Sequence, residues 1–116
     1  MTRAVVIQAQ GDDPALVLSA WQHAKNLLVV VGDDVPVEIV VQGAAVSGLT
    51  RGAPAAVTLA ARRDDMPGVR VLVCRNAMRA NDVDEDDLAE GFVPVPAGIA
   101  HLVQRQWEGW AYVRSS

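Results

Sequence analysis

Cysteine is almost absent from this chain of 116 residues, which contains only Cys74. A single cysteine cannot form a disulfide within the chain, and it fits a reducing compartment. Free cysteine is often buried as a small hydrophobic residue, so a structural role competes with a chemical one. The scarcity of cysteine therefore makes Cys74 either a reactive thiol or part of the core.

Basic residues are also few, with 10 Lys and Arg against 14 Asp and Glu and a net charge of -4. A nucleic-acid surface needs clustered Lys and Arg, so we expect no nucleic-acid partner. Aromatic residues make up only 4%, yet hydrophobic residues reach 51%. That fraction excludes intrinsic disorder, which requires low hydrophobicity.

Long hydrophobic runs are missing. No run approaches the roughly 18 apolar residues of a membrane span, and the first residues, MTRAVVIQAQGDD, do not resemble a signal peptide. We therefore expect a protein with no membrane partner that is soluble in the cytoplasm. The length of the chain predicts that residues 1–116 form a single domain.

Nucleotide and metal motifs are absent as well. Gly43, Gly48 and Gly52 mark a loop that has neither the Walker A nor the dinucleotide-binding pattern. This loop is either a turn followed by a short helix, or a set of backbone amides that line a pocket. The acidic residues 84–87 fit the first turn of a helix rather than a calcium loop. We expect no metal and no cofactor.

Apolar runs that alternate with helical segments dominate what is present. Strands are predicted at residues 4–7, 37–41, 69–73, 91–95 and 110–113, and the main helices at 14–29, 54–63 and 96–107. Valine-rich runs without alternation are typical of parallel strands covered on both faces. The pattern predicts a three-layer, flavodoxin-like α/β domain with a five-stranded, mainly parallel sheet in the order 2-1-3-4-5.

Two of the helices are amphipathic. In the helix at 14–29 the apolar face consists of Leu16, Val17, Ala20, Trp21, Ala24, Leu27 and Leu28. In the helix at 96–107 the apolar side consists of Ile99, Ala100, Leu102, Val103 and Trp107. His23, His101 and Arg105 fall on polar sides, where we expect solvated side chains.

Cys74 ends the third predicted strand and immediately precedes a helical turn. In the predicted strand order the ligand crevice lies between the first and third strands, which puts residues 9–12 beside the sulfur. A helix start and the neighbouring Arg75 would both favour a thiolate. We therefore expect a partly exposed, catalytic Cys74, and the candidate binding residues are Gln8, Gln10, Gly43, Arg75 and Asn76.

Several segments together resemble the DsrE-like family of small α/β proteins. They are AVVIQAQGDDP, HAKNLL, VEIVVQG, VLVCRNAMRANDV and VPAGIAHLVQRQWEGWAYV, which occur in the expected order over nearly the whole chain. The most specific feature is the combination of Cys74 with the final segment.

The resemblance implies a flavodoxin-like fold and assembly into trimers or hexamers. It also implies that a cysteine at the position of Cys74 accepts persulfide sulfur and passes it on. Because the chain has no second cysteine, such a relay requires a thiol on a donor or acceptor protein. Trp107, Trp110 and Tyr112, close together in sequence, are further reason to expect a homo-oligomer.

Three functions follow from these features. The first is a sulfur carrier, and possible sulfurtransferase, acting through Cys74. The alternative is a non-catalytic oligomeric module whose crevice binds a small anion or nucleotide. The third is a structural subunit in which Cys74 is buried.

Overall fold

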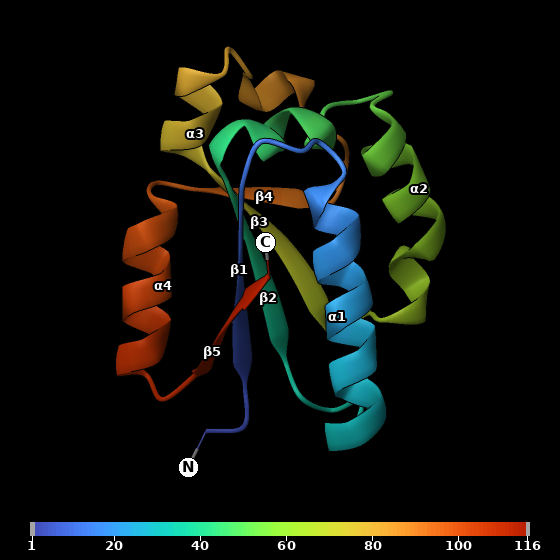
Figure 1. Cartoon of the computed structure of the whole chain (residues 1–116), viewed down its shortest axis with the longest axis vertical. Coiled ribbons are helices and arrows are strands. Elements are labelled where there is room, and N and C mark those ends of the chain that lie inside the picture. The colour runs from blue at the N-terminus through green and yellow to red at the C-terminus, as the bar shows by residue number, and fades with distance from the viewer. Residues whose placement is uncertain (1, 116) are drawn as a thin grey trace.

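A sheet of five parallel strands runs through the centre of the computed structural model, which describes residues 2–115 (Figure 1). The strands are β1 Val5–Gln10, β2 Val37–Gln42, β3 Val69–Cys74, β4 Phe92–Val95 and β5 Ala111–Ser115. The helices are α1 Leu16–Val31, α2 Pro54–Arg62, α3 Arg75–Ala80 and α4 Gly98–Trp107. Short 3₁₀ segments cover Gly43–Leu49, Arg63–Asp65 and Glu85–Asp87. The α/β class and the parallel sheet are confirmed.

The predicted strand order is wrong, because the strands follow one another as β4-β3-β2-β1-β5. The chain adds β2, β3 and β4 in one direction and then returns across the sheet to place β5 beside β1. Crossovers between parallel strands are right-handed, so a connection in the reverse direction must run over the opposite face. Helix α4 makes that return, and Figure 1 shows it on one side of the sheet, with α1 and α2 on the other.

The observed strand order also changes the position at which the sheet topology predicts a ligand crevice. The direction of the connections reverses between β1 and β5, not between β1 and β3. Strand β2 separates β1 from β3, which carries Cys74. The expectation that residues 9–12 lie in one crevice with Cys74 is therefore wrong.

The two faces of the sheet are packed unequally. The face under α1 and α2 carries the large core, and the predicted apolar face of α1 is confirmed in its buried residues Leu16, Val17, Ala20, Trp21, Ala24 and Leu28. The face under α4 carries only a small cluster, which consists of Val6, Val40, Leu72 and Leu102. None of the helices within residues 2–115 is long and apolar enough to cross a membrane.

Helix α4 does not bury the side that its sequence indicates. Leu102 is buried against the sheet, but Ile99 is 69%, Val103 38% and Trp107 82% exposed. These three residues recur every four positions and form one stripe on the outer surface of the helix. The predicted apolar side is therefore divided between the sheet and the surface.

A buried carboxylate explains this orientation. Glu38 in β2 lies beneath α4 and is only 2% exposed. Arg105 donates two hydrogen bonds to it, from Nε to Oε1 at 2.9 Å and from the terminal nitrogen to Oε2 at 2.8 Å. The Nε2 of His101 lies 2.6 Å from Oε1, and Arg70 of β3 lies 3.3 Å from Oε2. The expectation that His101 and Arg105 are solvated is therefore wrong.

The partners of Glu38 keep it ionised. Burial raises the pKa of this carboxyl group, but the hydrogen bonds and charges of Arg105 and His101 outweigh burial, so the pKa is lowered. The same ion pair raises the pKa of Arg105, whose guanidinium group also lies 4.3 Å from the ring centre of Trp110. Glu38 thus connects β2 to both α4 and the segment that follows it.

We predict that Glu38→Gln destabilises the protein at neutral pH by about 3 kcal/mol, because it removes one partner of a buried ion pair. Folding lowers the pKa of Glu38 below its ordinary value of 4.5, so the carboxylate stabilises the folded state above that pH. Its contribution is lost as the pH falls from 4.5 through the lower pKa of the folded protein.

Urea unfolding at a series of pH values measures this effect. The difference between wild type and Glu38→Gln should shrink as the pH falls below 4.5. Glu90→Gln, at an exposed glutamate with no ion pair among residues 2–115, is the control and should stay close to wild type. A stability difference between wild type and Glu38→Gln that stays constant with pH would contradict the conclusion that Glu38 is ionised in the folded protein.

Candidate functional site

Cys74 is the last residue of β3 and the residue immediately before α3. The apolar run at residues 71–73 forms a fully paired strand between β2 and β4, and the chain turns into a helix directly after the sulfur-bearing residue. The thiol therefore lies at the carboxyl end of the sheet, as predicted.

The expected exposure of Cys74 is wrong, because the residue is only 5% exposed. The start of α4 covers it, and the backbone N–H of Gly98 donates a hydrogen bond of 3.3 Å to Sγ. The amino-terminal end of a helix carries a partial positive charge. The sulfur thus lies beneath the positive end of a ten-residue helix.

Gly98 makes this close approach possible. A Cβ atom at this position would lie 2.8 Å from Cγ of Gln42, well inside van der Waals contact. Glycine at this position leaves room for the Gln42 side chain beneath the first turn of α4. Gln42 and Cys74 are therefore covered by the same helical turn.

Arg75 and Asn76 follow Cys74 in the first turn of α3, but their side chains interact with residues other than Cys74. The guanidinium group of Arg75 forms an ion pair with Glu85. The side-chain oxygen of Asn76 accepts a hydrogen bond from Arg79. Arg75 is half-buried and Asn76 is exposed, so both lie at the surface next to the covered thiol.

Gln8 and Gln10 belong to a cluster of polar side chains on the α4 face of the sheet. The Nε2 of Gln8 donates to Oε1 of Gln42 at 2.8 Å and to Oε1 of Gln10 at 3.2 Å. The hydroxyl of Tyr112 in β5 donates to Oε1 of Gln8. This glutamine cluster lies between β5, β1 and β2, where the connections reverse direction.

Gly43 follows β2 with a φ of 75°, a conformation that favours glycine. A Cβ here would lie 2.8 Å from the backbone oxygen of Gly11, which accepts a hydrogen bond from the N–H of Ala45. The close packing of these two backbone segments accounts for the glycine. Gly43 therefore joins the loops that follow β1 and β2.

The structure brings the predicted residues together in two groups. Gln8 and Gln10 interact directly, whereas Cys74, Arg75 and Asn76 follow one another two strands away. Gln42 connects the groups, because it bonds to Gln8 and packs against Gly98, whose N–H reaches the sulfur. Gln42 was missed by sequence reasoning, although it lies between the predicted strand at residues 37–41 and Gly43.

Glu38 was also missed as a candidate. The available signal was its position, a single charged residue within the apolar run Val37–Glu38–Ile39–Val40–Val41. A buried charge requires partners, and here they come from α4 and β3. Among residues 2–115, no three His, Cys, Asp or Glu side chains come together in a way that would hold a metal ion.

Comparison with known proteins gives structural relatives. No family model matches the chain, and no curated protein matches it. MTH1491, a protein of unknown function from Methanobacterium thermoautotrophicum, is 35% identical, with a TM-score of 0.82 over 96% of this chain and 97% of that one. The YchN protein from E. coli is 15% identical, with a TM-score of 0.74 over 98% and 99% of the two chains.

The two structural neighbours support different conclusions, one about the fold and the other about the family. Both have the DsrE-like fold, and the likeness to YchN shows this fold alone because the identity is low. The likeness to MTH1491 extends over nearly both chains at an identity that indicates common descent. The chain therefore belongs to the same family as MTH1491, and its fold is that of the DsrE-like proteins.

Proposed function

We propose that this protein is a carrier of persulfide sulfur and that Cys74 is the carrier residue. The observation that supports the proposal best is the hydrogen bond from Gly98 N–H to Sγ, in the first turn of α4. A helix start favours a thiolate over a thiol, and the thiolate is the nucleophile in sulfur transfer. The DsrE-like fold of the structural neighbours agrees with this role.

The proposed reaction has two displacement steps. The Cys74 thiolate attacks the outer sulfur of a donor persulfide, R–S–SH. A new S–S bond forms at Sγ, the donor S–S bond breaks, and the donor leaves as the thiolate R–S⁻ with the electron pair. In the second step a thiolate of the acceptor attacks the outer sulfur and regenerates the Cys74 thiolate. No oxidant or reductant is consumed, and both donor and acceptor thiols come from partners because the chain has one cysteine.

Transfer requires the thiol to become accessible. The segment that must move is residues 95–98, because Gly98 covers the sulfur. His101 and Arg105 hold the rest of α4 through their ion pairs with Glu38, which favours local opening of residues 95–98 over release of the whole helix. Arg75 and Asn76, at the surface beside the thiol, are the proposed contacts for a partner protein.

A non-catalytic binding module is the second candidate. It is favoured by the burial of Cys74 and by the glutamine cluster at the β1–β5 reversal, where ligands bind in open α/β sheets. In this role Gln8, Gln10 and the backbone near Gly43 would bind a small anion or nucleotide. Accessibility of the Cys74 thiol distinguishes the two candidates.

We further propose that the protein forms a homo-oligomer, either a trimer or a hexamer, and works in the cytoplasm. Ile99, Val103 and Trp107 form an exposed apolar stripe on α4, and such a stripe is unusual on a monomer. A reducing compartment keeps the single thiol available for sulfur transfer.

The first prediction from this proposal concerns sulfur loading. Incubation of the native protein with a persulfide donor should add one sulfur atom to Cys74, detected by intact mass spectrometry. Cys74→Ser should fold normally, since the change is nearly isosteric, and gain no sulfur. If Cys74 reacts only in denaturant, or if the Ser variant still gains sulfur, the binding module replaces the carrier.

A second prediction tests the cover formed by α4. Gly98→Ala should speed alkylation of Cys74, because the added Cβ meets Gln42 at 2.8 Å and displaces the first turn. The double variant Gly98→Ala with Gln42→Ala removes that contact and should return the rate toward wild type. Gly68→Ala is the control, because its Cβ would have nothing nearer than 3.9 Å. Equal rates in all four proteins would mean that α4 does not control access.

The third prediction concerns assembly. Light scattering at micromolar concentration should report a trimer or hexamer, and Val103→Glu should shift it toward the monomer because a charge would enter an apolar contact. Val30→Glu is the matched control, since Val30 is also exposed but lies at the end of α1. A wild-type monomer, or equal effects of the two substitutions, would contradict the proposed interface.

A further inference from the structure

A pocket of about 290 Å³ lies between α1 and α2, away from Cys74. Helices α1 and α2 lie on the face of the sheet opposite α4 (Figure 1), and the pocket shares no element with the glutamine cluster. Its lining comes from α1, from the end of α2 and from the turn that follows α2, and it consists of Trp21, Gln22, Lys25, Arg62, Asp65 and Met66.

The floor of this pocket is rigid and its rim is polar. Trp21 is only 4% and Met66 7% exposed, so both are fixed by the large core. Gln22, Lys25, Arg62 and Asp65 are exposed around them. Small-molecule sites commonly combine an apolar floor with a few polar groups that converge on it.

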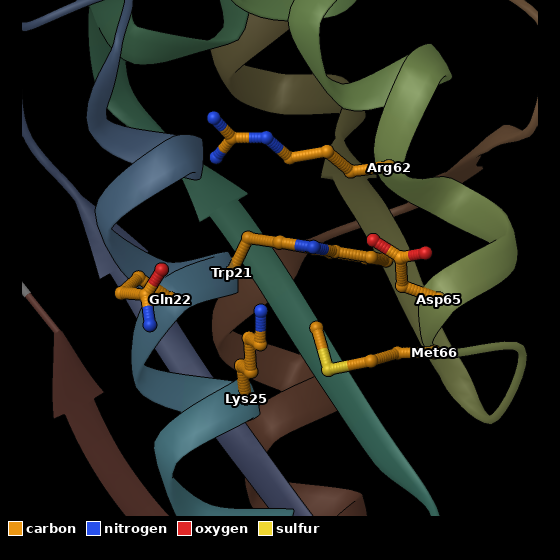
Figure 2. A pocket seen from close by; sticks show the side chains of 6 residues that line it. All are labelled: Trp21, Gln22, Lys25, Arg62, Asp65 and Met66. Atoms are coloured by element: carbon orange, nitrogen blue, oxygen red, sulfur yellow. The ribbon is translucent and has the colours of Figure 1, made fainter.

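The rim carries two cations without partners. Among residues 2–115, neither Lys25 nor Arg62 forms an ion pair, although Asp65 lines the same pocket. Figure 2 shows the indole of Trp21 edge-on, with the guanidinium group of Arg62 on one side and the ammonium group of Lys25 on the other. In a chain with a net charge of -4, this places an excess of positive charge at one concave position.

The indole adds a further donor. Trp21 Nε1 makes no hydrogen bond within residues 2–115. Every fully buried side-chain nitrogen or oxygen in that range has a hydrogen-bond partner, so this nitrogen is not fully buried. The Nε1–H group therefore keeps some exposure, and because Trp21 lines the pocket it is the indole group that could donate to a ligand there. Together, the indole, the ammonium group and the guanidinium group provide donors from three directions, and the carboxylate of Asp65 provides one acceptor.

We propose that this pocket binds a small organic oxyanion that also carries a hydroxyl group. Lys25, Arg62 and the Nε1–H of Trp21 would hold the phosphate or carboxylate oxygens, and Asp65 would accept a hydrogen bond from the hydroxyl. A pocket of about 290 Å³ is at the lower end of the size range of ligand sites, so the ligand is a small metabolite. This site is independent of sulfur transfer, and Cys74→Ser should bind the ligand as wild type does.

Titrations with glycerol 3-phosphate and with malate test the proposal and distinguish the phosphate from the carboxylate source. The readout is the indole N–H resonance of Trp21, observed alone in a background with Trp107→Phe and Trp110→Phe. We expect one of the two probes to shift this resonance with a Kd of about 1 mM or lower. Lys25→Gln and Arg62→Gln should each weaken binding about tenfold, the effect of losing a hydrogen bond to a charged group.

Two controls make the result decisive. Arg51→Gln, at an exposed arginine outside the pocket, should leave binding nearly unchanged. Asp65→Ala should weaken the hydroxylated probe but strengthen inorganic phosphate, because it removes both an acceptor and a repulsive charge. The proposal is overturned if neither probe shifts Trp21 at about 10 mM, if Arg51→Gln weakens binding as much as Arg62→Gln, or if Asp65→Ala affects both ligands alike.

Discussion

The buried carboxylate of Glu38 is the interaction on which the α4 side of the molecule depends. A charge removed from water is strongly unfavourable unless it is paired and hydrogen-bonded, so the helix above it must present Arg105 and His101 to the sheet. Once these two residues face inward, the orientation of α4 is fixed. Its first turn then lies over Cys74, and its apolar stripe of Ile99, Val103 and Trp107 faces outward.

The topology makes the two faces of the sheet chemically different. Helices α1 and α2 cover one face with a large apolar core, whereas α4 covers the other with only a small one. Polar side chains occupy the remaining space on the α4 face, including Glu38, Gln8 and Gln42. The face with the weaker core thus contains the groups that interact with Cys74 and with the β1–β5 reversal.

The two candidate sites are separated by the sheet itself. Cys74 lies under α4 at the carboxyl end of β3, whereas the cationic pocket lies between α1 and α2. Their chemistry also differs, since one depends on a nucleophilic sulfur and the other on donors directed at an oxyanion. A ligand in the pocket would contact the rigid floor of Trp21 and Met66, which belongs to the large core.

The sequence by itself determined the strands, the buried face of α1 and the location of Cys74 at the end of β3, because these follow from short apolar runs and from a 3.6-residue periodicity within one segment. The strand order, the burial of Cys74 and the partners of Glu38 were decided only by the tertiary structure. Each depends on where α4 crosses the sheet, which brings His101 and Arg105 to Glu38 and Gly98 to Cys74. Contacts between residues so far apart in the chain leave no local pattern, so the apolar residues of α4 alone could not indicate which side faces the sheet.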